Sequence, residues 1–579
     1  MKKKRVLWLF LLSLLCVIGL QAQTRKVKLV LVETSDVHGN YFPYDFINNR
    51  LGHGSMARIS AYMKQLRHGR RERGKGIVLL DNGDILQGQP SAYYYNYIDT
   101  ISTHLTADVL NYMKYDAATV GNHDVETGHS VYDRWVKQCN FPMLGANVIS
   151  ASDNQPYWKP YTIIERQGVK IAVLGMITPC IPKWLPRNLW TGLKFTDLMA
   201  TARKYMPEMQ RKADVVVGLF HSGVGNPDAY TEGCEDGALA VAREVPGFDV
   251  VFCGHDHRRA CQQVVNTVGD TVWVLNPAAQ AEAVAKANIV VTFKGRKVVK
   301  KHTIGSIVDI NNIAPDTSFI NHFSVQYERI KAFTSKVIGR NQHAMQSIPA
   351  LFGSSAFIDF IHQMQLSISG ADISFAAPLA LDATVPQGEV RVSDMFNLYR
   401  YENQLYVVKL TGREVKDYLE YSYSLWANQM HSDSDHLLLF RSDAETLSNP
   451  WQRLQNPCYN FDSAMGICYT VDVTKPVGQR VNITHMADGT PFDFNHTYRC
   501  ALSSYRGNGG GDLLTKGAGI SINDLSSRIV WSTEKDLRYY LIMGIERQGT
   551  INPRPQHTWK FIPEEWVDAA RKKDEPLLK

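Results

Sequence analysis

Short hydrophobic runs alternate with longer segments of mixed polarity from about residue 27 to residue 300. Six of these runs are KVKLVLVET, GIVLLDNGD, YDAATVGNHD, VKIAVLGMIT, ADVVVGLFHSG and FDVVFCGHDH. Aliphatic and β-branched runs of this length are typical of buried strands, and the segments between them are long enough to form helices. The pattern predicts a layered α/β domain in which helices cover the faces of β-sheets.

The pattern changes after about residue 300. Residues 321–345 have the composition of a helical linker. The region that follows mixes an amphipathic helix, SSAFIDFIHQMQLSI, with strands such as QLYVVKLTG and with glycine-rich loops. We therefore expect a first domain over 27–310, a linker over 311–349 and a second, smaller α+β domain over 350–565.

The first 22 residues have the features of a secretory signal peptide. The basic start MKKKR is followed by the apolar run VLWLFLLSLLCVIGL and by QAQ, in which Ala22 suits a cleavage site. The apolar run is shorter than the roughly 18 residues expected of a membrane helix. No other stretch approaches that length, so we expect an exported protein, either periplasmic or secreted or at the cell surface, with no membrane span in the mature chain.

Composition and charge narrow the classes of partner. The chain is 44% apolar and 21% charged, which is usual for a soluble globular protein. Its net charge is +7, but four positive charges lie in MKKKR, so the mature chain carries about +3. Without a basic run, the sequence does not favour a nucleic-acid polymer as partner, and no obligate protein partner is evident.

Eight of the nine cysteines lie beyond the apolar N-terminal run. In an oxidising compartment some of them could pair, and Cys458 and Cys468 are the nearest candidates in the C-terminal half. Spacing alone leaves this pairing open.

Residues that can bind metal ions follow five of the six runs. A single pair such as Asp36 and His38 in SDVHGN is most often an ordinary polar turn. Five such clusters are different, because the carboxyl ends of parallel strands meet at one edge of an α/β sheet. Oxygen and imidazole donors gathered there suit two divalent cations that share one carboxylate. The candidates are Asp36, His38, Asp84, Asn122, His221, His255 and His257.

In chain order these motifs read D-x-H, GD, GNH, H and GHxH, and with them the chain resembles the calcineurin-like metallophosphoesterases. Over nearly the whole mature chain it resembles the exported 5'-nucleotidase group, in which a metallophosphoesterase domain precedes a substrate-recognition domain. The resemblance implies a four-layer β-sandwich flanked by helices. It also implies that one ion binds Asp36, His38, Asp84 and His257, and that the other binds Asp84, Asn122, His221 and His255.

The same resemblance implies a mechanism. A metal-bound hydroxide attacks phosphorus in line, and two ions, which could be Zn, Mn, Fe or Co, offset the charge of the phosphate oxygens. His123 would stabilise the transition state or protonate the leaving oxygen. The family often has an Asp three residues after this histidine, whereas GNHDVE places Glu126 there. We expect His123 and Glu126 to form the catalytic pair, with Glu126 reaching through its longer side chain.

The C-terminal half carries motifs that resemble the family's nucleotide pocket. In LYRYENQLYVVKLTG, Tyr401 occupies the position of an aromatic residue that stacks on a base, and SSYRGNGGGD supplies Tyr505 before a glycine-rich loop. Aromatic rings on both sides of a base bind it with little preference for its identity, and glycines let the backbone approach a nucleoside. The YYYNY run at residues 93–97 has no such match and is interpreted as packing. The expected substrate-binding residues are Tyr401, Asn403, Asp462, Tyr505, Gly509 and Gly510.

Two subgroups of the family differ in the ester that they cleave. Typical 5'-nucleotidases carry N-G-G-x-R, whose arginine contacts the phosphate, whereas this chain has ADISFAAPLALD and no arginine between Arg340 and Arg391. The stretches SFAAP, DNGDILQGQP and SYRGNGGG are more similar to those of the 2',3'-cyclic-nucleotide 2'-phosphodiesterase/3'-nucleotidases. We therefore predict hydrolysis of 2',3'-cyclic nucleotides and/or 3'-nucleotides to nucleoside and phosphate.

Three alternatives remain at the level of the sequence. The first is a 5'-nucleotidase or UDP-sugar hydrolase. The second is a nucleotide-binding surface protein on a decayed enzyme scaffold, and the intact set of seven ligands argues against it. The third is hydrolysis of another ester, such as a sulfur-linked one, and the paired tyrosines disfavour it.

Overall fold

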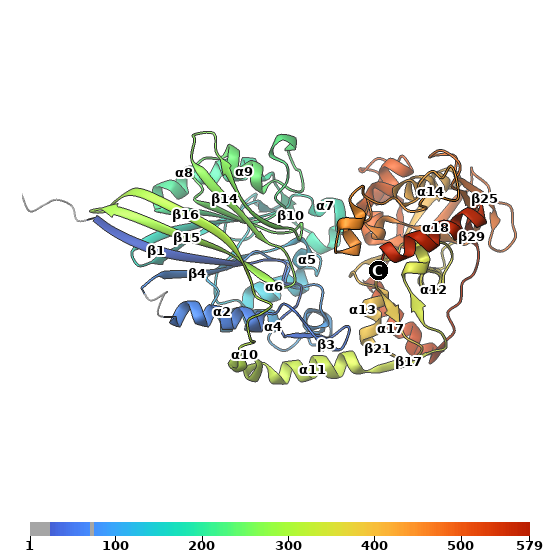
Figure 1. Ribbon diagram of the computed structural model, residues 1–579, viewed down its shortest axis with the longest axis horizontal. Coiled ribbons are helices and arrows are strands. Elements are labelled where there is room, and N and C mark those ends of the chain that lie inside the picture. Colours follow the sequence, from blue (N-terminus) through green and yellow to red (C-terminus); the bar gives the residue numbers. More distant parts are fainter. Residues whose placement is uncertain (1–23, 70–73) are drawn as a thin grey trace, which may run out of the picture.

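The computed structural model describes residues 24–69 and 74–579. An N-terminal and a C-terminal unit lie side by side and are joined by α10 (Thr317–His322) and α11 (Ser324–Ser335) (Figure 1). The expected signal peptide, residues 1–22, lies outside the described residues. In the part of the chain that is described, no helix combines the length and the apolar character needed to cross a membrane.

The N-terminal unit has four layers, with two six-stranded sheets between two layers of helices (Figure 1). The first sheet has the order β16 (Lys297–Asp309), β15 (Ala283–Lys294), β1 (Thr24–Thr34), β4 (Gly76–Asp81), β5 (Ala117–Thr119) and β6 (Met143–Leu144). The second has the order β13 (Arg259–Val265), β14 (Thr271–Pro277), β12 (Val250–Cys253), β11 (Val215–His221), β9 (Val169–Ile177) and β8 (Tyr161–Arg166). The predicted four-layer β-sandwich flanked by helices is confirmed.

The six hydrophobic runs form the parallel centres of the two sheets. In the first sheet β4 is parallel to both β1 and β5, and in the second β11 is parallel to both β9 and β12. One face of each sheet packs on the other sheet, and the opposite face packs on helices. The helices are α2 (Met56–His68), α4 (Leu105–Met113) and α6 (His129–Gln138) on the first sheet, and α8 (Leu198–Lys212) and α9 (Ala238–Glu244) on the second. Strands buried on both faces need apolar residues at every position, which explains the continuous runs.

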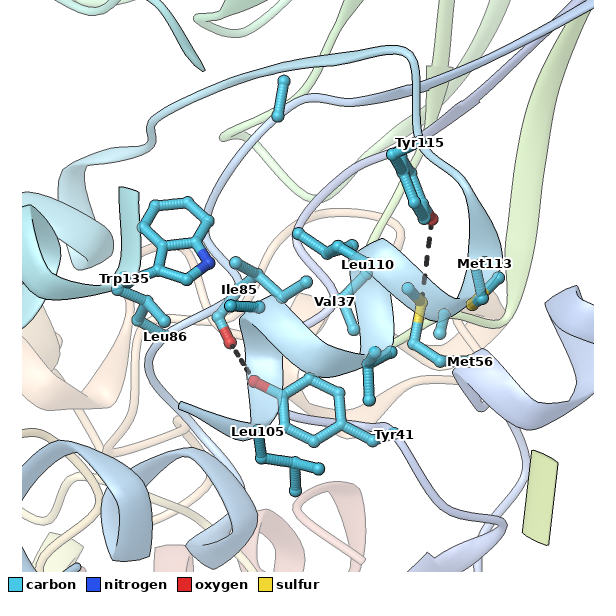
Figure 2. Packing of buried hydrophobic residues seen from close by; sticks show 14 of the residues in the cluster. Val37, Tyr41, Met56, Ile85, Leu86, Leu105, Leu110, Met113, Tyr115 and Trp135 are labelled. Atoms are coloured by element: carbon cyan, nitrogen blue, oxygen red, sulfur yellow. Dashed lines mark hydrogen bonds between the residues drawn. The ribbon is translucent and has the colours of Figure 1, made fainter. Parts of the chain in front are cut away.

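The core also fixes the loops that follow β1 and β4. Val37 and Ile85 have no exposed surface and pack together with the helices beneath them (Figure 2). The Tyr41 hydroxyl donates a hydrogen bond to the backbone oxygen of Ile85 at 3.0 Å, which ties the two loops together (Figure 2). Val37 lies between two candidate metal ligands and Ile85 directly follows a third. Burial of these apolar residues therefore holds the candidate ligands in place.

The C-terminal unit is built on a mixed five-stranded sheet. Its order is β23 (Ser463–Met465), β19 (Ile373–Ala376), β26 (Thr497–Ser503), β22 (Gln404–Thr411) and β27 (Ile529–Asp536). Around it lie α12 (Ala356–Ser369), α14 (Gly412–Trp426) and α17 (Leu537–Gln548). Thr411 and Glu414 form a capping box that satisfies free backbone N–H groups at the start of α14. This arrangement is the smaller α+β unit that the sequence predicts.

The expected linker is helical only in its first part. After α11 the chain enters β17 (Val337–Asn341), which pairs with β21 (Gly388–Arg391) and β28 (Thr550–Ile551). These residues therefore belong to the C-terminal unit by their hydrogen bonds.

The candidate disulfide between Cys458 and Cys468 is not formed. All eight cysteines in the described ranges are free. Cys458 is buried, whereas Cys468 lies on β24 (Ile467–Asp472) and is only partly buried.

The YYYNY run makes polar contacts between the two units as well as packing. The Tyr93 hydroxyl donates to Asp536 Oδ1 at 3.3 Å, and the Tyr97 hydroxyl donates to Glu402 Oε2 at 3.1 Å. Between these two carboxylates lies the fully buried Arg538, whose Nη1 is 3.6 Å from Glu402 Oε1. Because Glu402 lies between Tyr401 and Asn403, the contact links the relative position of the two units to the predicted nucleotide pocket.

Candidate metal centre and nucleotide cleft

The candidate metal ligands converge beyond the carboxyl ends of the parallel strands. They form two groups, and within each group the donor atoms lie within 4.8 Å of one another. The first group is Asp36, His38 and His257, and the second is Asp84, His221 and His255. The Asn122 side chain contacts both histidines of the second group. The two groups match the predicted sets, except that the geometry places Asp84 only in the second; its shared role remains a prediction.

The backbone around these ligands is unusual. Positive φ angles of 51°, 50°, 54°, 74° and 55° occur at Asp36, His38, Asp84, His255 and His257. Residues other than glycine seldom adopt this conformation, and such residues cluster at functional sites. Two glycines allow the loops to approach closely. A Cβ on Gly121 would lie 2.0 Å from Asp84 Oδ1, and a Cβ on Gly254 would lie 2.5 Å from Asp36 Oδ2.

In the first group, His38 Nε2 and Asp36 Oδ1 both approach His257 Nε2. His38 Nδ1 lies 3.2 Å from the backbone oxygen of Gln87, which can only accept, so the ring proton belongs on Nδ1. Its Nε2 is 3.0 Å from His257 Nε2, which is also 3.3 Å from Asp36 Oδ1. Burial and the neighbouring His257 lower the pKa of His38 to about 3, so its Nε2 stays unprotonated. A cation between these atoms satisfies all three.

The second group attracts positive charge in the same way. His221 Nδ1 donates to the backbone oxygen of Asn82 at 2.7 Å, which leaves Nε2 3.1 Å from Asp84 Oδ2 and from Asn122 Oδ1. Asp84 Oδ2 is buried and accepts no hydrogen bond from the described residues. Burial alone would lower the pKa of His221, but the carboxylates of Asp84 and Asp36 raise it to about 9. A proton or a metal ion is therefore favoured at this point.

Two residues that the motifs did not reveal support His255. Its Nε2 lies 2.8 Å from Glu235 Oε1, and its Nδ1 lies 2.8 Å from Asn122 Oδ1. Trp184 stacks on the imidazole, with ring centroids 5.5 Å apart and an angle of 23°. A carboxylate behind a histidine is the usual device for orienting a metal ligand. Neither residue belongs to one of the metal-binding motifs, so the sequence did not indicate these two contacts.

Asp124, which follows the GNH motif, holds the loops together. Its carboxylate accepts hydrogen bonds from the backbone N–H groups of Gly121, Asp84, Ile85 and Leu86 at 2.8 to 2.9 Å. Its role is thus to position the loop that carries Asp84.

His123 and Glu126 are in direct contact. His123 lies on α5 (Asn122–Val125), and Glu126 is the residue that follows this helix. His123 Nδ1 is 2.6 Å from Glu126 Oε2, so the longer side chain reaches the histidine as expected. Burial alone would lower the pKa of His123, but Asp84 and Glu126 raise it to about 10. The imidazole is therefore protonated at neutral pH, which suits a proton donor.

A cleft of about 570 Å³ lies between the two units. Its walls include His123, Glu126, Trp184 and His255 from the N-terminal unit and Tyr401, Asn403, Tyr459 and Tyr505 from the C-terminal unit. The Tyr459 ring lies 6.1 Å from Tyr401 and 6.5 Å from Tyr505, nearly perpendicular to both. Tyr459 is a third aromatic residue of the pocket, and its position three residues before the predicted substrate-binding residue Asp462 was the available signal.

Three of the predicted substrate-binding residues do not present a free group to the cleft. Asp462 lines the cleft, but its carboxylate accepts hydrogen bonds from Arg506 Nε at 3.1 Å and Nη2 at 3.0 Å. The described residues that line the cleft do not include Gly509 or Gly510. A Cβ on Gly510 would lie 2.5 Å from the Tyr505 ring, so glycine here makes room for the tyrosine.

Comparison with known families decides the class of protein. The profile of the calcineurin-like phosphoesterases matches residues 29–259, and that of the 5'-nucleotidase C-terminal domain matches residues 334–516. The chain belongs to the calcineurin-like phosphoesterases that carry a 5'-nucleotidase C-terminal domain. The predicted resemblance is thereby confirmed for both units.

Several proteins are similar to this phosphoesterase over most of its length. The 2',3'-cyclic-nucleotide 2'-phosphodiesterase/3'-nucleotidase of Haemophilus influenzae is 29% identical over 93% of this chain and 88% of its own. The trifunctional nucleotide phosphoesterase protein YfkN of Bacillus subtilis is 28% identical over 93% of this chain, which spans 39% of that relative. The crystal structure of a 5'-nucleotidase precursor from Thermus thermophilus has a TM-score of 0.62 at 19% identity, covering 93% of this chain and 99% of that one. At this identity it shows the fold alone.

Calcineurin-like phosphoesterases use divalent metal ions, and the donors of this phosphoesterase fit such ions. Imidazole nitrogens and carboxylate oxygens are ligands of borderline cations. A cation would satisfy the close approach of His38 Nε2, His257 Nε2 and Asp36 Oδ1 in one group, and that of Asp84 Oδ2 and His221 Nε2 in the other.

Proposed function

We propose that this phosphoesterase hydrolyses 2',3'-cyclic nucleotides and/or 3'-nucleotides to nucleoside and phosphate with two divalent ions. The observation that carries the proposal is a cleft whose walls combine the three tyrosines with Asn122, His255 and His257, which belong to both groups of candidate metal ligands. The name of the Haemophilus relative supports this choice of substrate. The expected signal peptide supports a periplasmic, secreted or cell-surface location.

The two ions would be held by the two groups of ligands. Asp36, His38 and His257 bind one ion, Asn122, His221 and His255 bind the other, and Asp84 is shared. Zn, Mn, Fe and Co all suit these nitrogen and oxygen donors. When bound, such ions polarise a phosphoryl group and lower the pKa of water.

The side chains of the cleft bind and orient the nucleotide. Tyr401 and Tyr505 stack on the base, while Tyr459 closes the pocket between them. His123 donates a proton to the ester oxygen that leaves, and Glu126 keeps the imidazole protonated and correctly turned. Asn403 is buried beside Tyr401 in the wall of the cleft and offers an amide to the nucleoside.

A single substrate panel tests the function. It contains 2',3'-cyclic AMP, 3'-AMP, 5'-AMP and UDP-glucose, each assayed with added Mn²⁺ and with EDTA. We expect higher kcat/KM for the cyclic nucleotide and 3'-AMP than for the other two, and loss of all activity in EDTA that Mn²⁺ restores.

Other results of the panel would favour the alternatives. A preference for 5'-AMP or the UDP-sugar would indicate the 5'-nucleotidase or UDP-sugar hydrolase, which the C-terminal domain match also permits. Nucleotide binding without activity that EDTA removes would indicate a non-catalytic surface protein.

Removal of a stacking tyrosine should weaken nucleotide binding selectively. Tyr401→Ala and Tyr505→Ala should each raise KM for 3'-AMP by about 5- to 150-fold, because one stacked base contributes about 1–3 kcal/mol. KM for p-nitrophenyl phosphate, which has no base, should change much less. Steady-state kinetics on both substrates measures the difference.

The conservative variants provide the control for this prediction. Tyr401→Phe and Tyr505→Phe keep the ring and should retain nearly normal KM for 3'-AMP. Equal losses on both substrates in the alanine variants would remove the stacking role.

A further inference from the structure

Two arginines line the cleft, and only one has a free side chain. Arg506 is almost fully buried and donates hydrogen bonds to Asp462, to Asn460 Oδ1 and to the backbone oxygen of Gly510. Arg258 is exposed, and its guanidinium makes no hydrogen bond or ion pair with the rest of the described chain. The described wall of the cleft contains no lysine. Among the arginines and lysines of the described cleft wall, Arg258 is therefore the one available to a bound anion.

The backbone of Arg258 is held rigidly beside the metal centre. It directly follows His257, and the carboxylate of Asp256 fixes this turn. Asp256 Oδ1 accepts the backbone N–H of Arg258 at 3.1 Å and Asn276 Nδ2 at 2.7 Å, and Oδ2 accepts the backbone N–H of Val224 at 3.1 Å. Because its backbone is fixed and its guanidinium is free, Arg258 is suited to bind a phosphate that lies at the neighbouring metal ligand His257.

The rest of the cleft gives a phosphate few other partners. Four carboxylates line it, namely Glu126, Glu235, Asp236 and Asp256, besides the one already paired with Arg506. No arginine lies between Arg340 and Arg391, so that segment supplies no guanidinium. A phosphate monoester has three terminal oxygens and up to two negative charges near neutral pH, whereas a cyclic diester has two such oxygens and one charge. A guanidinium fork can bind two terminal oxygens of either ester, but it attracts the more highly charged monoester more strongly.

We propose that the Arg258 guanidinium binds terminal oxygens of a phosphate monoester and thereby favours the 3'-nucleotidase reaction over the opening of a 2',3'-cyclic diester. The inference rests on the proposed function and adds a residue that selects between its two substrate classes. Arg258 is a substrate-binding residue in this role.

Replacement of Arg258 tests the inference through the ratio of the two activities. Arg258→Ala should lower kcat/KM for 3'-AMP by about 10- to 150-fold, the equivalent of one hydrogen-bonded charge pair, with a much smaller loss for 2',3'-cyclic AMP. The inhibition constant of inorganic phosphate should rise by a similar factor. Arg258→Lys should recover only part of the loss, because an ammonium keeps the charge but not the planar fork.

Arg259 provides a matched control one position along the chain. It begins β13, forms an ion pair with Asp309 at 3.3 Å and does not line the cleft, so Arg259→Ala should leave the ratio unchanged. Equal losses on both substrates, or no loss, in Arg258→Ala would overturn the inference while the wild-type activities leave the proposed function intact. Failure of the wild-type protein to cleave either substrate would instead refute the proposed function, and the inference with it.

Discussion

Asp84→Ala should abolish turnover and reduce bound metal at both groups of ligands. The shared carboxylate is the one residue proposed to hold both ions, and its Oδ2 lies 3.1 Å from His221 Nε2. Loss of a residue that only supports a ligand costs about 10- to 100-fold, so loss of this ligand should exceed about 100-fold in kcat/KM. Elemental analysis of the purified protein and kinetics on 3'-AMP measure the two effects together.

The control for this variant is an aspartate on the same unit but outside the site. Asp153 lies on an exposed loop, and Asp153→Ala should keep normal metal content and activity. Circular dichroism of both variants shows whether the fold is retained. Normal metal content and turnover in Asp84→Ala would show that the ligand assignment is wrong.

His123→Asn should slow hydrolysis of 3'-AMP by about 10²- to 10⁴-fold, the usual range for loss of a general acid. The loss should be much smaller for p-nitrophenyl phosphate, because p-nitrophenolate leaves without a proton whereas a ribose oxygen does not. Glu126→Gln should act in the same direction with a smaller loss, since the imidazole remains but its 2.6 Å carboxylate partner is removed. Comparison of kcat for the two substrates measures the effect.

A second histidine–carboxylate pair on the next helix is a matched control. His129 Nδ1 lies 3.0 Å from Asp133 Oδ2 on α6, outside the cleft. His129→Asn should therefore leave both activities unchanged. If His123→Asn slowed the two substrates equally, proton donation to the leaving oxygen would be the wrong role for this residue.

Residues close to a strand end were the most predictable part of the site. Asp36 and His38 follow β1, Asp84 follows β4, and His255 follows β12, so a hydrophobic run and a polar cluster in the sequence were enough to locate them. The pairing of His123 with Glu126 was also within reach, because residues three apart share one face of a helix.

Residues that act across larger distances were not predictable in the same way. Glu235 and Trp184 reach His255 from separate loops, and Tyr459 joins the tyrosine pair only because β22, β26 and the loop before β23 come together. Asp462 shows the converse, since its motif suggested a pocket residue but Arg506 occupies its carboxylate.

The sequence by itself determined the layered α/β fold and the order of the candidate metal-binding motifs, because each depends on the periodicity and composition of neighbouring residues. The aromatic residues of the proposed nucleotide pocket were predicted from the resemblance of their motifs to those of the family. Only the tertiary structure decided that the pocket and the motifs share one cleft, that Tyr93 and Tyr97 bond across the two units, and that Arg258 rather than Arg506 is free. Those outcomes depend on which distant side chains meet and satisfy one another's hydrogen bonds and charges. Local sequence does not contain that information, since the hydrogen-bond partners of these polar groups are distant in the sequence and meet only in the folded chain.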